Sequence, residues 1–495
     1  MKRYILALDE GTTSARSLLY NIKDRCVEAV CGRPVRQFYP EAGWVEEDAN
    51  EIFETQLATV NDAVGRADIP MSSVACIGIA NQRETVVAWD SISGEPLYNA
   101  IVWQCRRTAD LCEKLKADGR AGMIYDKTGL VIDAYFSGTK IKWLIDNVPA
   151  VREGIAAHRV MFGTVDSWLI YKLTGGRLHV TDFTNASRTM LFNIHTLEWD
   201  RELLEMLGIP GNTLPSVVLS SGLVGYTDES VTGARIPVCG IAGDQQAALF
   251  GQACFEAGHA KNTYGTGCFI LMNTGKTPVK SKNNLLTTIA WGMDEGMTYA
   301  LEGSIFNAGS TLQWLRDGLG LISETSEADR VSALTPDTNG VYVVPAFTGL
   351  GAPYWDMYAR GIITGLTRGT TKNHLIRAAL ESIAYQSADV FEAMTDDSGI
   401  ALSEIRVDGG ASASDVLMGF QAGLLGVRVL RPETLETTAM GACFLAGLGA
   451  GIFQNKDEVG SLWRLEREFV PSMPSKQRET LIGGWKRAVE RAKGK

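Results

Sequence analysis

The sequence predicts an α/β protein of two large domains, and three observations support this. Short apolar runs alternate with helix-forming stretches along the whole chain, as in α/β folds. At 495 residues the chain is too long for one hydrophobic core. Polar turns follow several apolar runs, and the ligands of open α/β sheets bind beyond the carboxyl ends of strands. We place the domains at residues 1–251 and 252–495.

Composition and charge are those of a globular protein, with 45% apolar and 21% charged residues. The net charge of −10 disfavours nucleic acid or an anionic membrane as the main partner. The nine cysteines include no CxxC pair, so no zinc site or disulfide framework is suggested. No apolar run approaches the roughly 20 residues of a membrane span, and a signal-peptide pattern is absent. We expect a cytoplasmic protein without membrane insertion.

The chain opens with a strand, a polar turn and a second strand. Residues 4–8 are apolar, residues 9–14 read Asp-Glu-Gly-Thr-Thr-Ser, and residues 17–20 resume the strand. Backbone N–H groups and hydroxyls in such a turn can bind phosphate oxygens, and Asp9 can hold Mg²⁺ directly or through water. An ordinary hairpin turn has the same composition, so this segment alone leaves both interpretations open.

A buried-strand pattern over residues 74–80 ends in the polar run Asn81-Gln82-Arg83-Glu84-Thr85. Polar residues at a strand's end are poor core material and suit a ligand site. Arg83 can donate to the hydroxyls of a polyol and Glu84 can accept from them, unless the two form an ion pair in a solvated turn. Trp103 and Tyr135 follow, and aromatic faces pack against the C–H groups of small polyols, although most Trp residues are core.

Asp244 stands where a strand should end and a helix should begin. Residues 236–239 are apolar enough for a buried strand, and residues 245–251 suit a helix. With no Cβ on Gly243, a carboxylate at this strand end can face a substrate hydroxyl. Asp is also a good helix N-cap, and the two roles can coexist.

The second half of the chain contains a weak echo of the first. Residues 261–272 again place a Gly/Thr turn before an apolar strand, and residues 405–411 end a strand in Asp-Gly-Gly. Such turns suit a nucleotide bound between two related halves, whereas Walker A and GxGxxG motifs are absent. Elsewhere we expect helices over 140–147, 150–157, 165–173, 373–394 and 477–495, strands over 300–304 and 342–347, and a surface loop over 220–234.

Taken in order, these motifs resemble the FGGY carbohydrate kinase family, and within it the members that phosphorylate glycerol. The resemblance rests on residues 8–14, 81–85, 101–107, 135–140, 240–251, 263–267 and 365–382. Single motifs are weak, but all of them in this order, over nearly the whole chain, are specific. The resemblance implies two actin-like (ribonuclease H-like) ATPase domains flanking a catalytic cleft. It also implies a kinase that uses ATP and Mg²⁺ to convert glycerol to sn-glycerol 3-phosphate in glycerol catabolism.

The resemblance also implies roles for individual residues. Asp244 would be the general base that accepts the proton of the attacking hydroxyl. Glycerol would be bound by Arg83, Glu84, Trp103, Tyr135, Asp244, Gln245 and Phe269. ATP would be bound by Thr12, Thr13, Ser14, Arg16, Thr266, Gly309, Gln313, Gly410 and Ser414. Asp9 and Asp244 would position Mg²⁺.

Three residues depart from the family pattern. Glu10 stands where many relatives carry Gln, Ala134 where Pro is usual, and Ser414 where Asn is often found. The resemblance further implies a homo-oligomer, either dimer or tetramer, and a loop near Gly233 and Arg235 that binds fructose 1,6-bisphosphate in some relatives. Two alternatives stay open: a family member acting on xylulose or gluconate, and a non-metabolic actin-like ATPase that needs no polyol.

Overall fold

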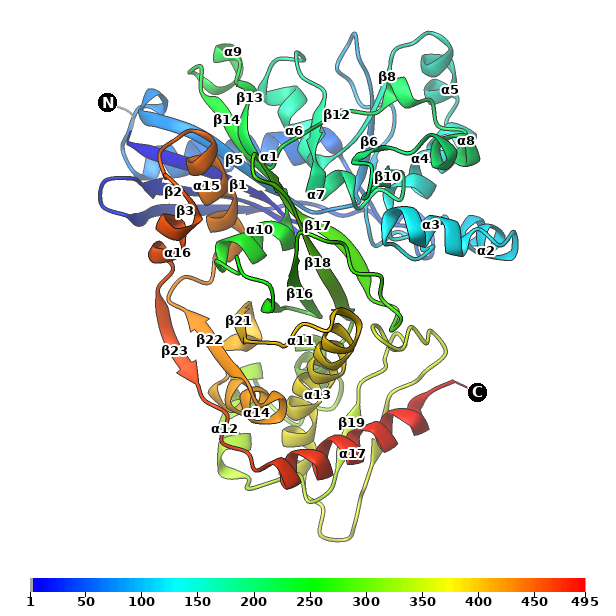
Figure 1. Cartoon of the computed structure of the whole chain (residues 1–495), viewed down its shortest axis with the longest axis vertical. Coiled ribbons are helices and arrows are strands. Elements are labelled where there is room, and N and C mark those ends of the chain that lie inside the picture. The colour runs from blue at the N-terminus through cyan, green and yellow to red at the C-terminus, as the bar shows by residue number, and fades with distance from the viewer. Residues whose placement is uncertain (1–2, 495) are drawn as a thin grey trace.

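The computed structural model describes residues 3–494. The fold is built on two large open β-sheets with helices around them, and the first sheet lies above the second in Figure 1. The first sheet has the strand order β13-β14-β5-β1-β2-β3 and the second β17-β18-β16-β15-β21-β22-β23. The strands of the first sheet are β1 (Tyr4–Glu10), β2 (Ser14–Asn21), β3 (Cys26–Pro34), β5 (Val74–Asn81), β13 (Ser221–Tyr226) and β14 (Pro237–Gly243). Those of the second are β15 (His259–Tyr264), β16 (Cys268–Gly275), β17 (Leu286–Met293), β18 (Gly296–Ile305), β21 (Glu404–Asp408), β22 (Arg428–Pro432) and β23 (Leu465–Phe469).

The two sheets repeat one topology. In the first, β1 pairs antiparallel with β2 and parallel with β5, which pairs parallel with β14. In the second, β15 pairs antiparallel with β16 and parallel with β21, which pairs parallel with β22. The second strand of each hairpin also pairs antiparallel with a further strand, β2 with β3 and β16 with β18. The shared topology confirms the internal repeat expected from residues 261–272 and 405–411.

Short sheets and helices surround this framework. The short strands are β4 (Glu46–Glu47), β6 (Val86–Asp90), β7 (Ala100–Ile101), β8 (Val160–Thr164), β9 (Val180–Asp182), β10 (Phe192–Asn193), β11 (Glu198–Trp199), β12 (Ser216–Val218), β19 (Tyr342–Val344) and β20 (Ile362–Thr364). Helices of the first half are α1 (Ala49–Arg66), α2 (Ala109–Ala117), α3 (Ala121–Thr128), α4 (Ser137–Asn147), α5 (Pro149–Ala156), α6 (Val165–Leu173), α7 (Phe183–Ala186), α8 (Arg201–Leu207), α9 (Glu229–Thr232) and α10 (Asp244–Gly251). Those of the second are α11 (Gly309–Gln313), α12 (Thr325–Leu334), α13 (Lys372–Ser398), α14 (Asp415–Leu425), α15 (Thr437–Gly449), α16 (Lys456–Leu462) and α17 (Ser475–Ala492).

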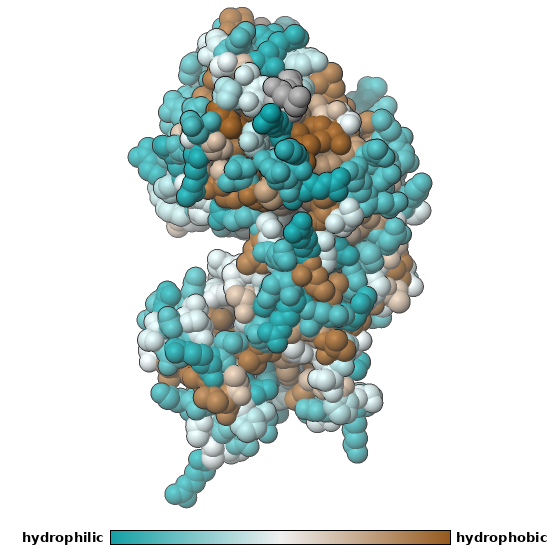
Figure 2. All heavy atoms as spheres, turned by 90° about the vertical axis from the view of Figure 1, so that its left-hand side faces the viewer, coloured by the Kyte–Doolittle hydropathy of each residue, from teal (hydrophilic) through white to brown (hydrophobic). Residues whose placement is uncertain are grey.

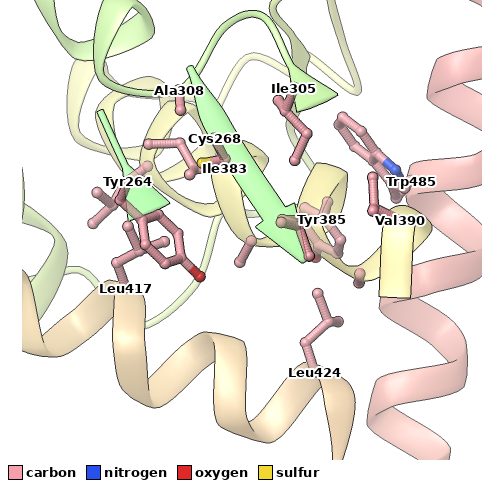
Figure 3. Packing of buried hydrophobic residues seen from close by; sticks show 14 of the residues in the cluster. Tyr264, Cys268, Ile305, Ala308, Ile383, Tyr385, Val390, Leu417, Leu424 and Trp485 are labelled. Atoms are coloured by element: carbon pink, nitrogen blue, oxygen red, sulfur yellow. The ribbon is translucent and has the colours of Figure 1, made fainter. Parts of the chain in front are cut away.

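The long helix α13 is the centre of the core of the second half. A capping box between Thr371 and His374 starts the helix, and Gly399 in the left-handed conformation ends it. Its buried face packs on the second sheet, α14 and α17, and Figure 3 shows side chains from these elements converging. Within this core the rings of Tyr385 and Trp485 stack with centroids 5.2 Å apart. No helix within residues 3–494 is long and apolar enough to cross a membrane.

Helix α15 crosses back to the first sheet, where it lies against β1, β5 and β14 (Figure 1). The approach is so close that a Cβ on Gly78 would lie 2.1 Å from the Ala442 carbonyl oxygen. A Cβ on Gly441 would lie 1.8 Å from the carbonyl oxygen of Ala247 in α10. Glycine is therefore required at both places. The expected boundary after residue 251 stays a prediction, and α15 belongs by packing to the sheet on its far side.

Two expectations about local structure are wrong. β1 continues through Asp9 and Glu10, so both lie in a strand, and the turn is closed by the Gly11 N–H, which donates to the Ser14 carbonyl at 3.0 Å. Residues 220–234 contain β13 and α9 rather than only a loop, because an edge strand can be polar on its open side. The expected helices are found within a few residues of their predicted bounds, except that residue 495 lies outside the described residues.

Candidate active site

The candidate site forms where three neighbouring parallel strands of the first sheet end. The register pairs Glu10 of β1 with Asn81 of β5, and Asn81 with Gly243 of β14. Residues that follow these strand ends are therefore brought to one edge of the sheet, including Arg83 and Asp244. The surface is indented between the upper and lower parts of the molecule, as Figure 2 shows.

Arg83 is the centre of a buried cluster of charges. Its guanidinium lies 2.6 and 2.9 Å from the two carboxylate oxygens of Glu302 and 3.1 Å from Asp244 Oδ1. It also donates to Gln246 Oε1 at 3.2 Å and to the Tyr135 hydroxyl at 3.4 Å. Four of the five N–H donors of the guanidinium thus have hydrogen-bond acceptors within the protein, and the fifth, on Nε, belongs to the ion pair with Asp244. The alternative of a solvated Arg83–Glu84 pair is wrong, because both side chains are buried.

Arg188 completes the cluster from the loop after α7. Its Nε lies 2.7 Å from Glu84 Oε1 and its Nη2 lies 3.0 Å from Glu302 Oε1. Burial alone would raise the pKa of Glu302, but the two guanidiniums outweigh it and lower that pKa to about 2. Both arginines are therefore paired, as buried charges must be if the fold is to tolerate them.

Arg188 and Glu302 escaped the sequence-based prediction, although each carries a recognisable signal. Glu302 is a lone charge within an apolar strand, and such a charge requires a buried partner. Arg188 ends the polar run Thr184-Asn185-Ala186-Ser187-Arg188, which is buried throughout. The partners lie more than 100 residues apart in sequence, so neither signal identifies the other residue.

Asp244 is the first residue of α10 and the most exposed member of the cluster. Its side chain is 28% exposed, whereas those of Arg83, Glu84, Arg188 and Glu302 are at most 2% exposed. Gly243 is the N-cap, and no side chain caps the helix, so the interpretation of Asp244 as an N-cap is wrong. Instead Oδ1 accepts from the Gln245 N–H at 2.8 Å and Oδ2 accepts from Gln245 Nε2 at 3.1 Å.

An aromatic wall adjoins this cluster. The Trp103 ring lies edge-on to Tyr135, with centroids 5.4 Å apart, and to Phe269, with centroids 6.3 Å apart. Phe269 comes from β16 of the second sheet, so the wall is shared between the halves. Trp103 Nε1 donates to Thr12 Oγ1 at 2.9 Å. This bond joins the wall to the turn that is expected to bind phosphate.

The loop that carries Tyr135 is held by a buried lysine. Lys140 Nζ donates to the Tyr135 carbonyl and, at 3.2 Å, to the Phe136 carbonyl. Burial lowers the pKa of Lys140 to about 8, and the Glu84 carboxylate acts to raise it. These two bonds fix the loop even though Ala134 stands in place of the expected proline.

The expected phosphate-binding residues lie in two hairpin turns or, for Ser14 and Arg16, at the start of β2. Thr13 and Arg16 are exposed after β1, and Thr266 is exposed in the equivalent turn after β15. Gly309 begins α11 against that second turn, where its N–H donates to the Gly265 carbonyl at 3.0 Å. Arg16 reaches across to Glu436 in the second half at 3.1 Å. Open N–H groups and hydroxyls of this kind are available to a ligand.

The nucleoside-side residues share the corresponding edge of the second sheet. Thr263 of β15 pairs with Asp408 of β21, so the turns at Thr266 and Gly410 are neighbours. Ser414 caps α14 and its hydroxyl donates to Asp329, so that hydroxyl already has a protein partner. Gln313 is exposed at the end of α11, and Thr12 and Ser14 are half-buried.

Asp9 and Asp244 are the expected Mg²⁺ ligands. Burial raises the pKa of Asp9 to about 7, Arg16 acts to lower it, and the Asp244 carboxylate raises it further. Among residues 3–494 no group of three or more His, Cys, Asp or Glu side chains is arranged to hold a metal ion. Mg²⁺ usually takes one or two carboxylates and completes its shell with phosphates and water, so the pair fits a magnesium nucleotide.

A second carboxylate pair lies beneath the first phosphate turn. Gln82 Nε2 donates to Glu10 Oε2 at 3.2 Å and to Glu47 Oε2 at 2.7 Å. Burial and the neighbouring Glu47 raise the pKa of Glu10 well above its ordinary value, and burial raises that of Glu47 to about 8. Glu10 Oε1 is buried with no hydrogen-bond partner among the described residues.

Comparison with known proteins identifies the family. Residues 4–251 match the N-terminal domain of the FGGY family of carbohydrate kinases, and residues 260–450 match its C-terminal domain. A glycerol kinase of Symbiobacterium thermophilum is 59% identical, covering 100% of this chain and 99% of its own, and glycerol kinase 2 of Thermotoga maritima is 57% identical, covering 99% of each. The solved structure of Plasmodium falciparum glycerol kinase with ADP has a TM-score of 0.94 at 37% identity, covering 99% of this chain and 98% of its own. This likeness confirms the two actin-like domains, and the chain belongs to the FGGY family of carbohydrate kinases.

Proposed function

We propose that this chain transfers the γ-phosphoryl group of ATP to glycerol and so forms sn-glycerol 3-phosphate in glycerol catabolism. The proposal rests on Asp244, a carboxylate left partly exposed and paired with Arg83, whose buried guanidinium also contacts Tyr135 of the aromatic wall. The full-length likeness to bacterial glycerol kinases supports the same substrate.

Asp244 acts as the general base. Its carboxylate accepts the proton of a glycerol hydroxyl, whose oxygen forms the new bond to the γ-phosphorus, while the bond to the bridging oxygen breaks and ADP leaves with the electron pair. Phosphoryl transfer needs mainly positioning and charge stabilisation. Arg83 and Gln245 support this role because they fix both oxygens of the Asp244 carboxylate.

Hydrogen bonds select the substrate. Glycerol buries too little area for apolar contact to select it, so directed bonds from Arg83, Glu84, Tyr135 and Gln245 must do so. Because four of the five Arg83 donors already have acceptors and Nε pairs with Asp244, a glycerol hydroxyl must share or replace the contact to Tyr135 or Asp244. This leaves little capacity for a larger polyol, which favours glycerol over xylulose or gluconate.

The two hairpin turns and the residues beside them bind ATP. Thr12, Thr13, Ser14, Arg16 and Thr266 would bind its phosphates, and Gly309, Gln313 and Gly410 would lie around its nucleoside. Ser414 would contribute its backbone or a shared hydroxyl, because Asp329 already accepts from it. Asp9 and Asp244 would hold Mg²⁺, which would neutralise charge on the phosphates.

The test measures ADP release from magnesium ATP with glycerol, xylulose or gluconate, and without an acceptor. We expect strong stimulation by glycerol alone. Stimulation by xylulose or gluconate instead would reassign the substrate within the family. Steady hydrolysis that ignores every acceptor would contradict the kinase and favour an actin-like ATPase.

Assembly and effector control stay predictions. Arg235 lies over the Tyr226 ring at 4.2 Å, after Gly233 ends α9 in the left-handed conformation. The groove beside it, about 420 Å³, is also lined by Arg177 and Asp228, which form an ion pair. Arg235 supports an anionic effector such as fructose 1,6-bisphosphate, although Glu229 also lines the groove. A dimer or tetramer is proposed from the resemblance alone.

A further inference from the structure

Lys261 is a buried cation that the proposed reaction has not yet used. It lies in β15 with its side chain fully buried, and its ammonium donates to Gln245 Oε1 and, at 2.9 Å, to Thr263 Oγ1. No carboxylate oxygen of residues 3–494 lies within 4.0 Å of the ammonium. Burial lowers the pKa of Lys261 to about 8, although Asp408 and Asp244 act to raise it. Burying a cation without a direct ion pair is costly, so a role beyond packing is expected.

The chemistry of an ammonium determines how Gln245 is oriented. A lysine ammonium has three donors and no acceptor, so only the oxygen of the Gln245 amide can face it. The amide nitrogen must then point the other way, where Nε2 donates to Asp244 Oδ2 at 3.1 Å. Without Lys261, rotation of the amide by half a turn would set Oε1 against Oδ2, which are two acceptors.

The Asp244 carboxylate depends on this amide at one oxygen. Oδ1 is held by the Gln245 backbone N–H and by Arg83 Nε. Oδ2 has a single donor among the described residues, which is Gln245 Nε2. The orientation of the carboxylate therefore requires the amide in the polarity that Lys261 imposes.

We propose that Lys261 is a positioning residue for phosphoryl transfer, acting on Asp244 through the amide of Gln245. The inference rests on the proposed function, in which Asp244 is the base. The contact between Lys261 and Gln245 also links the two halves of the chain, because Gln245 lies in α10 and Lys261 in β15. Thr263 lies on the same face of β15 two residues on, toward the turn of Thr266, so the nucleotide side and the base share this connection.

A double-mutant cycle tests the proposal. Gln245→Leu, Lys261→Met and the double variant are compared with the wild type for kcat and KM, with glycerol and magnesium ATP. We expect each single change to lower kcat about 10- to 100-fold, as for a misplaced catalytic group, while the KM for ATP changes little. The double variant should be no slower than the slower single variant, because both remove one connection. If the fold-losses in kcat of the two single variants multiply in the double variant, the proposal is wrong.

Lys140→Met is the matched control, since Lys140 is equally buried but donates to backbone carbonyls rather than to Gln245. In the double variant with Gln245→Leu, the fold-losses in kcat from the two changes should multiply. If they do not, the coupling to Gln245 is not specific to Lys261. Lys261→Met should change Tm little, because relief of the desolvation cost of a buried cation offsets the loss of its hydrogen bonds to Gln245 and Thr263. A fall in Tm that accounts for the lost activity would assign Lys261 a structural role only.

Two further variants keep the result interpretable. Lys261→Arg also presents only donors, so it should retain more kcat than Lys261→Met, and an equal loss would count against the proposal. Asp244→Asn in the same assay separates the two levels of inference. If Asp244→Asn stays active, the proposed base is wrong; if it is inactive while the Lys261 and Gln245 effects multiply, only the present inference fails.

Discussion

The two sheets share a topology but differ in what they place at the edge that faces a ligand. After β5 and β14 of the first sheet, Arg83 and Glu84 are buried in a paired network, and Asp244 alone is partly exposed. After β15 and β21 of the second sheet, Thr266 and Gly410 lie in exposed turns. Under the proposed function, this difference would let the same framework serve two tasks: enclosing a small polyol with fixed hydrogen bonds, and binding a larger nucleotide with open backbone donors.

The largest effect should come from Asp244→Asn, which asks whether the first edge supplies the base by itself. The amide keeps the shape of the carboxylate but cannot accept the proton, so we expect kcat to fall by about 10²- to 10⁴-fold with Tm nearly unchanged. Steady-state kinetics with glycerol and thermal unfolding measure the two quantities. Turnover close to wild type would remove Asp244 from the base role.

The next test compares buried and exposed ion pairs that join the halves. Glu302→Gln removes a charge that pairs with Arg83 and Arg188, and we expect a loss of about 3 kcal/mol in unfolding free energy and at least a tenfold rise in the KM for glycerol. Glu436→Gln removes the exposed partner of Arg16 and should cost less than about 1 kcal/mol. Chemical denaturation measures both unfolding free energies. Equal losses of unfolding free energy in the two variants would contradict the difference between buried and exposed ion pairs.

The smallest effect concerns the protonation of Glu10. Its folded pKa is raised well above that of the unfolded chain, so its contribution to stability is complete below about pH 4.5 and is lost as the pH rises toward the folded pKa. Glu10→Gln keeps the acceptor for Gln82 and removes the charge beside Glu47. We expect the variant to exceed the wild type in Tm by an amount that grows from pH 5 to pH 8. Glu436→Gln, tested over the same pH range, serves as a control. If the difference in Tm between Glu10→Gln and the wild type does not depend on pH, the explanation is wrong.

Much of the site was predictable because it depends on local patterns. A buried strand followed by polar residues can be detected within a window of about ten residues, and this pattern identified the segments around Asp9, Arg83 and Asp244. The hairpin turn at Thr266 and the strand end before Gly410 followed from the same pattern. The limits of β1 were missed because Asp and Glu disfavour strands locally, whereas pairing with β2 and β5 extends the strand through them.

By itself, the sequence determined the alternation of strands and helices, the internal repeat and the residues at the strand ends. Tertiary structure alone decided which polar groups meet: the charge of Glu302 with those of Arg83 and Arg188, and the Lys261 ammonium with the Gln245 amide. The physical reason is that a buried charge requires a partner but does not specify where in the chain that partner lies. Strand register and the approach of the two sheets make that choice, and they depend on packing along the whole chain.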